Sequence, residues 1–219
     1  MTETANGPSF DSVIKALRFA FNSGLGRIPQ PSAMRTLAEQ LEHERQTKGR
    51  GPEETRRRWD DGSVKHLQGL DRTAQAAFIL AVVGRLDQNH QNLLAARFTN
   101  PRTDCECGSP CCRGWRMTKS WDSAVGAICL TLQTEGEVTK VPGKRGLSTE
   151  PRLRRALVEQ FVHPTGVSVR QLSLSFDLSQ ITVAKHSGWI GTFLDQEYQE
   201  AMTEVSLLFD QAGVTGFLP

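Results

Sequence analysis

The chain has 219 residues, of which 38% are hydrophobic and 23% are charged, and its formal net charge at pH 7 is +2. This composition is typical of a globular protein with a buried core and excludes a largely disordered chain. The net charge is too small to make the whole chain basic, so a nucleic-acid surface would require a local concentration of basic residues. The longest apolar run, 76–83, is too short to cross a bilayer, and the first residues lack a charged-then-apolar leader. We therefore expect a cytoplasmic protein with no membrane partner.

Two helices are predicted before residue 48. An amphipathic helix follows Ser9 and Asp11 and ends at the glycines 24 and 26, and a second helix follows Pro31. The segment 48–62 is polar and contains three consecutive arginines, which indicates a linker or a phosphate-contacting loop.

The middle of the chain predicts two more helices. The segment 71–86 is apolar on nearly every side, so we expect it at the centre of the fold. Asp87 caps the next helix, 88–98.

A cluster of cysteines follows, because four of the five cysteines fall within eight residues. They are Cys105, Cys107, Cys111 and Cys112. Thiolates this close in a reducing cell need a partner, and a structural Zn²⁺ with a closed tetrahedral shell is the expected one. Either all four bind, or three bind with His90, His163 or Cys129. The alternatives are a free thiol cluster or a redox switch for the loop, and a small buried hydrophobe for Cys129. His90, in the first turn of its helix, is expected at the surface or as a cap.

Positive charge surrounds this cysteine loop. Arg113, Arg116 and Lys119 flank Trp115, which indicates a basic and aromatic patch for single-stranded nucleic acid or for a protein. The alternative is that Trp115 only covers the metal loop. A helix over 121–132 follows, with a linker after it.

The next helix begins after Thr149 with Pro151 in its first turn and stops at His163. Six basic residues and one acidic residue lie between Lys140 and Arg155, which favours phosphate contact near the start of this helix or a solvated face. The phosphate-contacting candidates are Arg152, Arg154 and Arg155. No Lys or Arg follows His186, so the acidic end of the chain is expected to face a protein or water.

The segment 168–190, SVRQLSLSFDLSQITVAKHSGWI, has the apolar spacing of a DNA-binding helix-turn-helix. Ser168 is the expected N-cap of a helix ending near Ser175, Asp177 occupies the left-handed turn position, and Ser179 caps a second helix. From Trp189 a long amphipathic helix is expected to continue until Gly213. The alternative is an ordinary helical hairpin inside a larger bundle.

The second helix of this segment predicts the DNA contacts. Ile181, Val183 and Ala184 are expected to face the protein, and the polar side chains between them to face base edges and phosphates. The candidate DNA-binding residues here are Ser179, Gln180, Thr182, Lys185 and His186, with Arg170 from the first helix.

The segment Leu86–Phe98, LDQNHQNLLAARF, resembles the helix that precedes the DNA-reading hairpin in region 4 of sigma factors. The segment Arg154–Trp189 looks like a second copy of that helix with its hairpin. With the zinc loop, residues 70–198 are similar to the late-gene antitermination proteins of lambdoid phages, the Q proteins. The resemblance implies a protein of the bacterial host cell that binds double-stranded DNA at a late promoter. It would then engage RNA polymerase with its sigma factor, with the zinc loop meeting polymerase or the exiting RNA, and carry it past terminators.

We expect a mainly α fold, a helical bundle with a helix-turn-helix module and an inserted cysteine-rich zinc loop. The expected domains are N-terminal helices with a basic linker (1–62), central helices (63–134) with the zinc loop at 99–119, a linker (135–148) and the DNA-binding module (149–219). No nucleophile with its base, carboxylate pair or phosphate-binding motif has usable spacing, so we expect no enzyme and no small-molecule substrate. Two alternatives are a dimeric helix-turn-helix repressor or activator, and a zinc-stabilised adaptor that binds only proteins.

Overall fold

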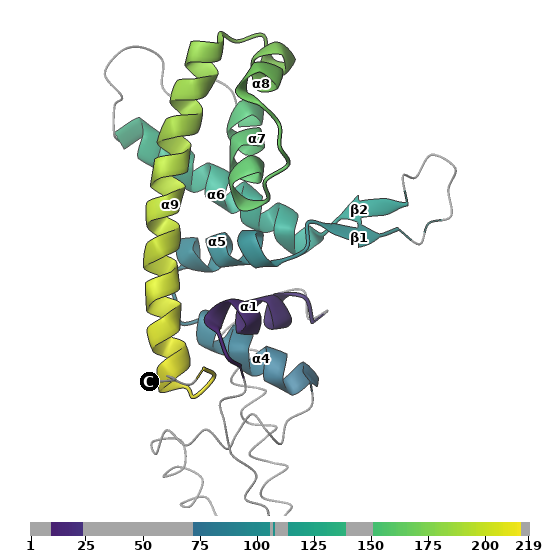
Figure 1. Ribbon diagram of the computed structural model, residues 1–219, viewed down its shortest axis with the longest axis vertical. Helices are drawn as coiled ribbons and strands as arrows, with labels where there is room; N and C mark the ends of the chain where they lie inside the picture. The colour runs from purple at the N-terminus through teal and green to yellow at the C-terminus, as the bar shows by residue number, and fades with distance from the viewer. Residues whose placement is uncertain (1–9, 24–71, 106, 108–113, 139–150, 216–219) are drawn as a thin grey trace, which may run out of the picture. The chain divides into compact units, whose positions relative to one another are not determined.

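A computed structural model describes residues 10–23, 72–105, 107, 114–138 and 151–215. Within them the chain forms seven α-helices and one two-stranded antiparallel sheet (Figure 1), which confirms a mainly α fold. None of the described helices is both long enough and apolar enough to cross a membrane. The predicted helix after Pro31 and the arginine run of 48–62 lie outside the described residues.

The chain divides into two compact units. Residues 1–87 and 202–219 form unit 1, and residues 88–201 form unit 2. The predicted boundaries at 62/63 and 148/149 fall outside the described residues, and the one at 134/135 falls within a helix.

Unit 1 contains α1 (Val13–Phe21) and α4 (Arg72–Val83). The Ser12 side chain caps α1 by accepting a hydrogen bond of 3.3 Å from the Lys15 backbone N–H. The apolar side chains of α4 are all buried or half-buried, as expected for a helix inside its unit. The end of the long helix α9 (Gln180–Gln211) also belongs to this unit, and Phe209 is fully buried there.

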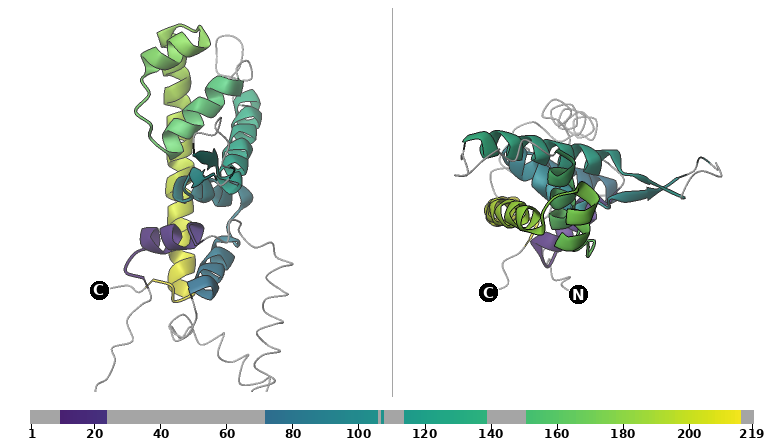
Figure 2. Two further views of the ribbon diagram at one scale, coloured as in Figure 1. Left: turned by 90° about the vertical axis from the view of Figure 1, so that its right-hand side faces the viewer. Right: turned by 90° about the horizontal axis from the view of Figure 1, so that it is seen from above.

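Unit 2 contains α5 (Gln88–Phe98), α6 (Lys119–Val138), α7 (Pro151–Val162), α8 (Val169–Phe176) and the first part of α9. All five helices contribute buried side chains to one apolar core. The Trp121 indole N–H donates a buried hydrogen bond of 3.0 Å to the Ala96 carbonyl, which ties the start of α6 to the end of α5. The strands β1 (Arg102–Asp104) and β2 (Trp115–Met117) connect these two helices and project away from them (Figures 1 and 2).

Two helices run further than expected. Helix α6 continues to Val138 instead of ending at Leu132. Gly136 does not stop it, because one glycine within a helix costs only about 1 kcal/mol. Helix α9 is continuous from Gln180 to Gln211, where two successive helices were expected. Its buried residues Val183, Ile190, Leu194 and Ala201 follow one another at steps of seven and four. Since this apolar stripe stays in register past Gly188 and Gly191, no packing change requires a break there.

Candidate nucleic-acid interface and cysteine hairpin

Residues 168–190, which we call the helical hairpin, comprise α8, a short turn and the start of α9. Ser168 forms a capping box with Gln171, since its Oγ accepts from the Gln171 N–H (3.2 Å) and the Gln171 Oε1 accepts from the Ser168 N–H (2.8 Å). Asp177 has φ 50° and ψ 46°, in the left-handed region. The Ser179 Oγ accepts from the Thr182 N–H at 3.1 Å. The predicted caps and turn residue are therefore confirmed.

A residue that the sequence pattern did not single out closes the turn. Ser173 is buried, and its hydroxyl donates to the Leu178 carbonyl at 2.6 Å. In the reverse direction, the Leu178 N–H donates to the Ser173 carbonyl at 3.1 Å. These two hydrogen bonds fix where α9 begins relative to α8.

The inner face of the helical hairpin belongs to the core of unit 2. Leu172, Val183 and Ile190 are buried within the same apolar cluster as side chains of α5, α6 and α7. The hairpin is therefore held by packing as well as by its caps, because burying such side chains stabilises the fold by about 1.5–3 kcal/mol each.

Arg97 makes a further link to this region. Its guanidinium donates to the carbonyl oxygens of Phe161 and Val162 at the end of α7, and it lies over the rings of Phe161 (5.7 Å) and Tyr198 (5.6 Å). It thus connects α5 to α7 and α9. In the sequence, Arg97 is part of the segment Leu86–Phe98 that resembles sigma region 4.

The outer face of α9 carries a row of exposed residues at its start, which we call the outward row. It consists of Gln180, Ile181, Ala184, Lys185 and Gly188. The expectation that Ile181 and Ala184 face the protein is wrong, since Ile181 is 70% exposed and Ala184 is exposed too. The reason is angular: each residue turns about 100° around the helix, so with Val183 at the centre of the buried face Ile181 points away from it.

The other predicted contacts of α9 lie beside this row. Thr182 is half-buried, and its hydroxyl shares a hydrogen bond of 2.8 Å with the Ser179 hydroxyl. His186 is half-buried, and burial lowers the pKa of its imidazole, so the ring is neutral at pH 7. Ser179 and, on α8, Arg170 are exposed.

The three arginines of α7 divide into two kinds. Arg152 is exposed. Arg154 is only 3% exposed and donates to the Cys129 carbonyl (3.1 Å) and the Gln133 Oε1 (3.2 Å) of α6. Arg155 binds the carboxylates of Asp122 and Glu159, the latter at 2.8 Å. The expected phosphate contact therefore fits Arg152, whereas the other two guanidinium groups bind within the protein. Lys140, Lys144 and Arg145 lie outside the described residues.

Residues 102–117, which we call the cysteine hairpin, contain the small sheet, and Cys105 directly follows strand β1. Strands β1 and β2 pair antiparallel with Arg102 opposite Met117 and Asp104 opposite Trp115. The Cys105 N–H donates to the Gly114 carbonyl at 3.0 Å, which brings the two ends of the cysteine loop together. Cys105 is half-buried and Cys107 is exposed, and neither forms a disulfide. Cys111 and Cys112 lie outside the described residues.

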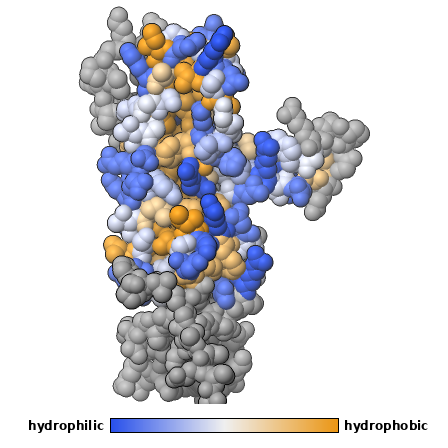
Figure 3. Space-filling view, in the orientation of Figure 1, coloured by the Kyte–Doolittle hydropathy of each residue, from blue (hydrophilic) through white to orange (hydrophobic). Residues whose placement is uncertain are grey.

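Of the predicted basic and aromatic patch, strand β2 carries Trp115 and Arg116, and Lys119 is the first residue of α6. The Arg102 guanidinium lies 4.3 Å from the centre of the Trp115 ring, and Arg116 is exposed. The face of this hairpin seen in Figure 3 is mainly hydrophilic to neutral. Arg113 lies outside the described residues.

The three alternative metal ligands lie elsewhere in unit 2. Cys129 is on α6 and packs against the core, and burial raises the pKa of its thiol to about 11, so it is protonated at neutral pH. His90 is buried on α5, contrary to the expected surface position, and its Nε2 lies 3.8 Å from the Glu197 carboxylate. His163 is exposed after the end of α7. Cys129 thus behaves as the small buried hydrophobe that was its alternative interpretation.

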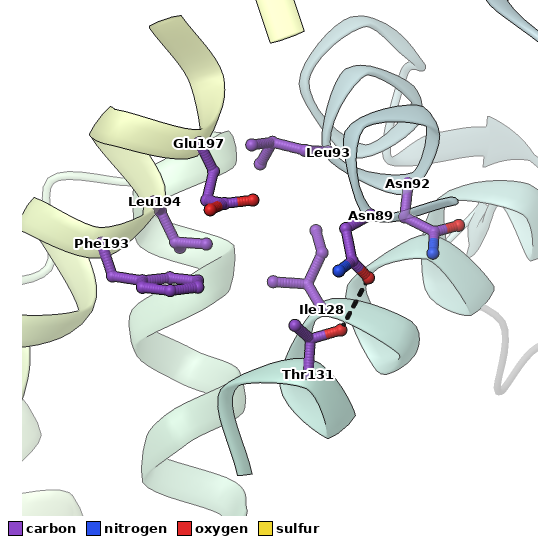
Figure 4. Close-up of a pocket in the computed structure, with 8 residues that line it drawn as sticks. All are labelled: Asn89, Asn92, Leu93, Ile128, Thr131, Phe193, Leu194 and Glu197. Atoms are coloured by element: carbon purple, nitrogen blue, oxygen red, sulfur yellow. Dashed lines mark hydrogen bonds between the residues drawn. The ribbon is translucent and has the colours of Figure 1, made fainter. Parts of the chain in front are cut away.

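A small pocket lies between α5, α6 and α9 (Figure 4). Its volume is about 20 Å³, which is room for one or two water molecules. Polar groups reach it from Asn89, Asn92, Thr131 and Glu197, and the Thr131 hydroxyl donates to Asn89 at 3.0 Å. A pocket of this size does not hold an organic substrate, which needs about 300 Å³ or more.

No family model, curated protein or solved structure matches this chain. Its function is therefore inferred from its own residues.

Proposed function

We propose that this chain is a sequence-specific double-stranded DNA-binding protein that uses the helical hairpin as a helix-turn-helix. The observation that carries the proposal is the outward row, at the start of a capped helix whose opposite face is buried through Val183 and Ile190. In a helix-turn-helix the first residues of the second helix enter the major groove and contact base edges.

The exposed groups have the chemistry for this contact. A Gln side chain such as Gln180 can form two hydrogen bonds with one adenine, and a Lys side chain such as Lys185 can bind guanine or phosphate. Arg152 and Arg170 are exposed on the helices that precede the turn and supply phosphate contacts. The N-terminal end of α9 adds a partial positive charge.

The charge along α9 limits the contact to its first turns. Lys185 is followed on the exposed side by Asp195 and Glu200, and no Lys or Arg follows His186. Ten residues of helix span about 15 Å, so the groove of the DNA meets the outward row before the acidic residues are reached. The acidic part then faces water or a protein, because phosphates would repel it.

We also propose a structural Zn²⁺ in the cysteine hairpin. Cys105 and Cys107 form no disulfide, Cys111 and Cys112 follow within five residues of Cys107 in the sequence, and the Cys105 N–H donates to the Gly114 carbonyl, which joins the two ends of this segment. Thiolates are the donors that Zn²⁺ prefers, and the metal supplies a cross-link without an open position for catalysis. Zinc measured in purified protein should fall in Cys107→Ser and persist in Cys129→Ser. Unchanged zinc in Cys107→Ser would move the ligands elsewhere.

At a finer level, we propose a transcription regulator that engages RNA polymerase and sigma factor in a bacterial cytoplasm and promotes terminator readthrough. The resemblance of Leu86–Phe98 and Arg154–Trp189 to sigma region 4 supports it. Readthrough of a terminator in a purified transcription reaction tests it. Repression or activation without readthrough would instead identify a conventional regulator.

DNA binding itself is tested by a mobility-shift assay with a pool of random-sequence duplexes at two salt concentrations. We expect tighter binding at low salt and selection of a preferred sequence. Lys185→Gln should weaken binding to all sequences and reduce the slope of log K against log salt by about 0.9. Arg18→Gln removes the same charge from an exposed position of α1, outside both hairpins, and is the matched control. Absence of salt-dependent binding would overturn the proposal and favour a protein-binding adaptor.

A further inference from the structure

The two most exposed large hydrophobic side chains among the described residues belong to the helical hairpin. Leu174 on α8 is 76% exposed, and Ile181 on α9 is 70% exposed. Ile181 contributes little to the core, because Val183 and Ile190 supply the buried contacts of this part of α9. A β-branched side chain is also a weaker helix former than a polar straight-chain residue, so the fold itself does not favour Ile181 at this position.

Ile181 is part of a strip of apolar and small residues on α9. Ala184 and Gly188 follow it at i+3 and i+7, which places the three on one face of α9. A Cβ atom added to Gly188 would have no neighbour within 4 Å, so the space outside this strip is open. Gln180 and Lys185 border the strip with polar groups.

Among the chemical groups on the edges of base pairs in the major groove, one is apolar and fits such a strip. The C5-methyl group of thymine projects into the major groove, where apolar side chains distinguish it from cytosine. Small side chains next to Ile181 allow the helix backbone to come close to the base edges. A charged or strongly hydrated strip would not favour a methyl group.

We propose that Ile181, supported by Ala184, determines specificity by contacting thymine methyl groups in the major groove, beside an adenine bound by Gln180. This inference rests on the proposed DNA binding. It adds the kind of base that the start of α9 recognises, which is an A·T pair with its methyl group toward the helix.

Uracil substitution tests the contact, because deoxyuridine pairs with adenine as thymidine does and lacks only the methyl group. The duplex selected by the wild-type protein from a random pool is synthesised with deoxyuridine at each thymidine position in turn. At one or two positions we expect the wild-type affinity to fall about fourfold, the effect of one buried methyl group. Ile181→Ala should bind the thymine and uracil duplexes with affinities within about twofold of each other.

Leu174→Ala is the matched control, since Leu174 is equally exposed but lies on α8. It should retain the fourfold preference for thymine. Specific binding with no effect of uracil at any position would overturn the methyl contact and leave the proposed function intact. Failure of the wild-type protein to select any sequence would overturn both.

Discussion

The helical hairpin and the cysteine hairpin are both candidate contact surfaces of unit 2, but different forces hold them. The helical hairpin has buried residues on its inner face, a capping box and a turn closed by Ser173. The strands of the cysteine hairpin have no buried residue, and three backbone pairs with the Arg102–Trp115 contact join them. The core therefore holds the first, whereas backbone pairing and one cation–π contact hold the described strands of the second.

The largest contrast is expected from truncating one apolar side chain in each hairpin. Ile190→Ala removes a buried side chain and should lower the free energy of unfolding by about 2–5 kcal/mol. Met117→Ala acts on a side chain that is 40% exposed and should change it by less than about 0.5 kcal/mol. Urea denaturation followed by circular dichroism measures both. Equal losses would show that the cysteine hairpin also depends on apolar packing.

The turn of the helical hairpin gives the next effect. Asp177→Val places a β-branched residue at φ 50° and should cost about 1–2 kcal/mol of stability. Asp177→Gly is the control, because glycine adopts this conformation without steric cost. Its free energy of unfolding should exceed that of the valine variant by about 1–2 kcal/mol. Equal thermal stability of the two variants would contradict a strained left-handed turn.

Glycine substitution should separate folding from DNA contact. Gly188→Ala has open space in the free protein and should stabilise α9 by about 0.5–1 kcal/mol. The added methyl group should nevertheless weaken DNA binding, because it stands in the outward row. Gly126→Ala, on α6 and equally open, should stabilise without changing the affinity. Unchanged DNA affinity in Gly188→Ala would place the DNA elsewhere.

Metal removal should act on the cysteine hairpin alone. Chelation of the proposed zinc should speed tryptic cleavage within residues 102–117, since the loop loses its cross-link. The free energy of unfolding of the helical core should change by less than about 0.5 kcal/mol, and DNA affinity should stay within about twofold. A loss of DNA affinity on chelation would show that the two hairpins are coupled.

The smallest effect concerns pH. Burial holds the pKa of His186 below its ordinary value of 6.5, so the unfolded chain takes up the proton first as the pH falls. The stability linked to neutral His186 is present above pH 6.5 and decreases as the pH falls through the lowered pKa of the folded state. His186→Gln should therefore flatten the dependence of unfolding free energy on pH between about 7 and 5. An unchanged dependence would mean that other groups cause it.

The sequence correctly predicts those features that depend only on neighbouring residues. The caps Ser168 and Ser179 and the left-handed Asp177 follow from contacts between residues five or fewer positions apart. For the same reason α5 and α7 have the predicted ends, because a cap, a proline or a proline-preceding residue acts on its own neighbours.

Packing between helices, and not the pattern along one helix, determines which side of each helix meets the core. The sequence pattern predicted that Ile181 faces the protein, but the packing of Val183 and Ile190 on the other helices leaves it facing outward. The same holds for Arg154 and for His90, whose polar heads were expected at the surface and are buried against neighbouring helices. These outcomes depend on residues far apart in the chain, which periodicity along one helix does not contain. The local pattern determined the caps and the left-handed residue of the helical hairpin, and the packing of five helices determined which side chains the hairpin presents.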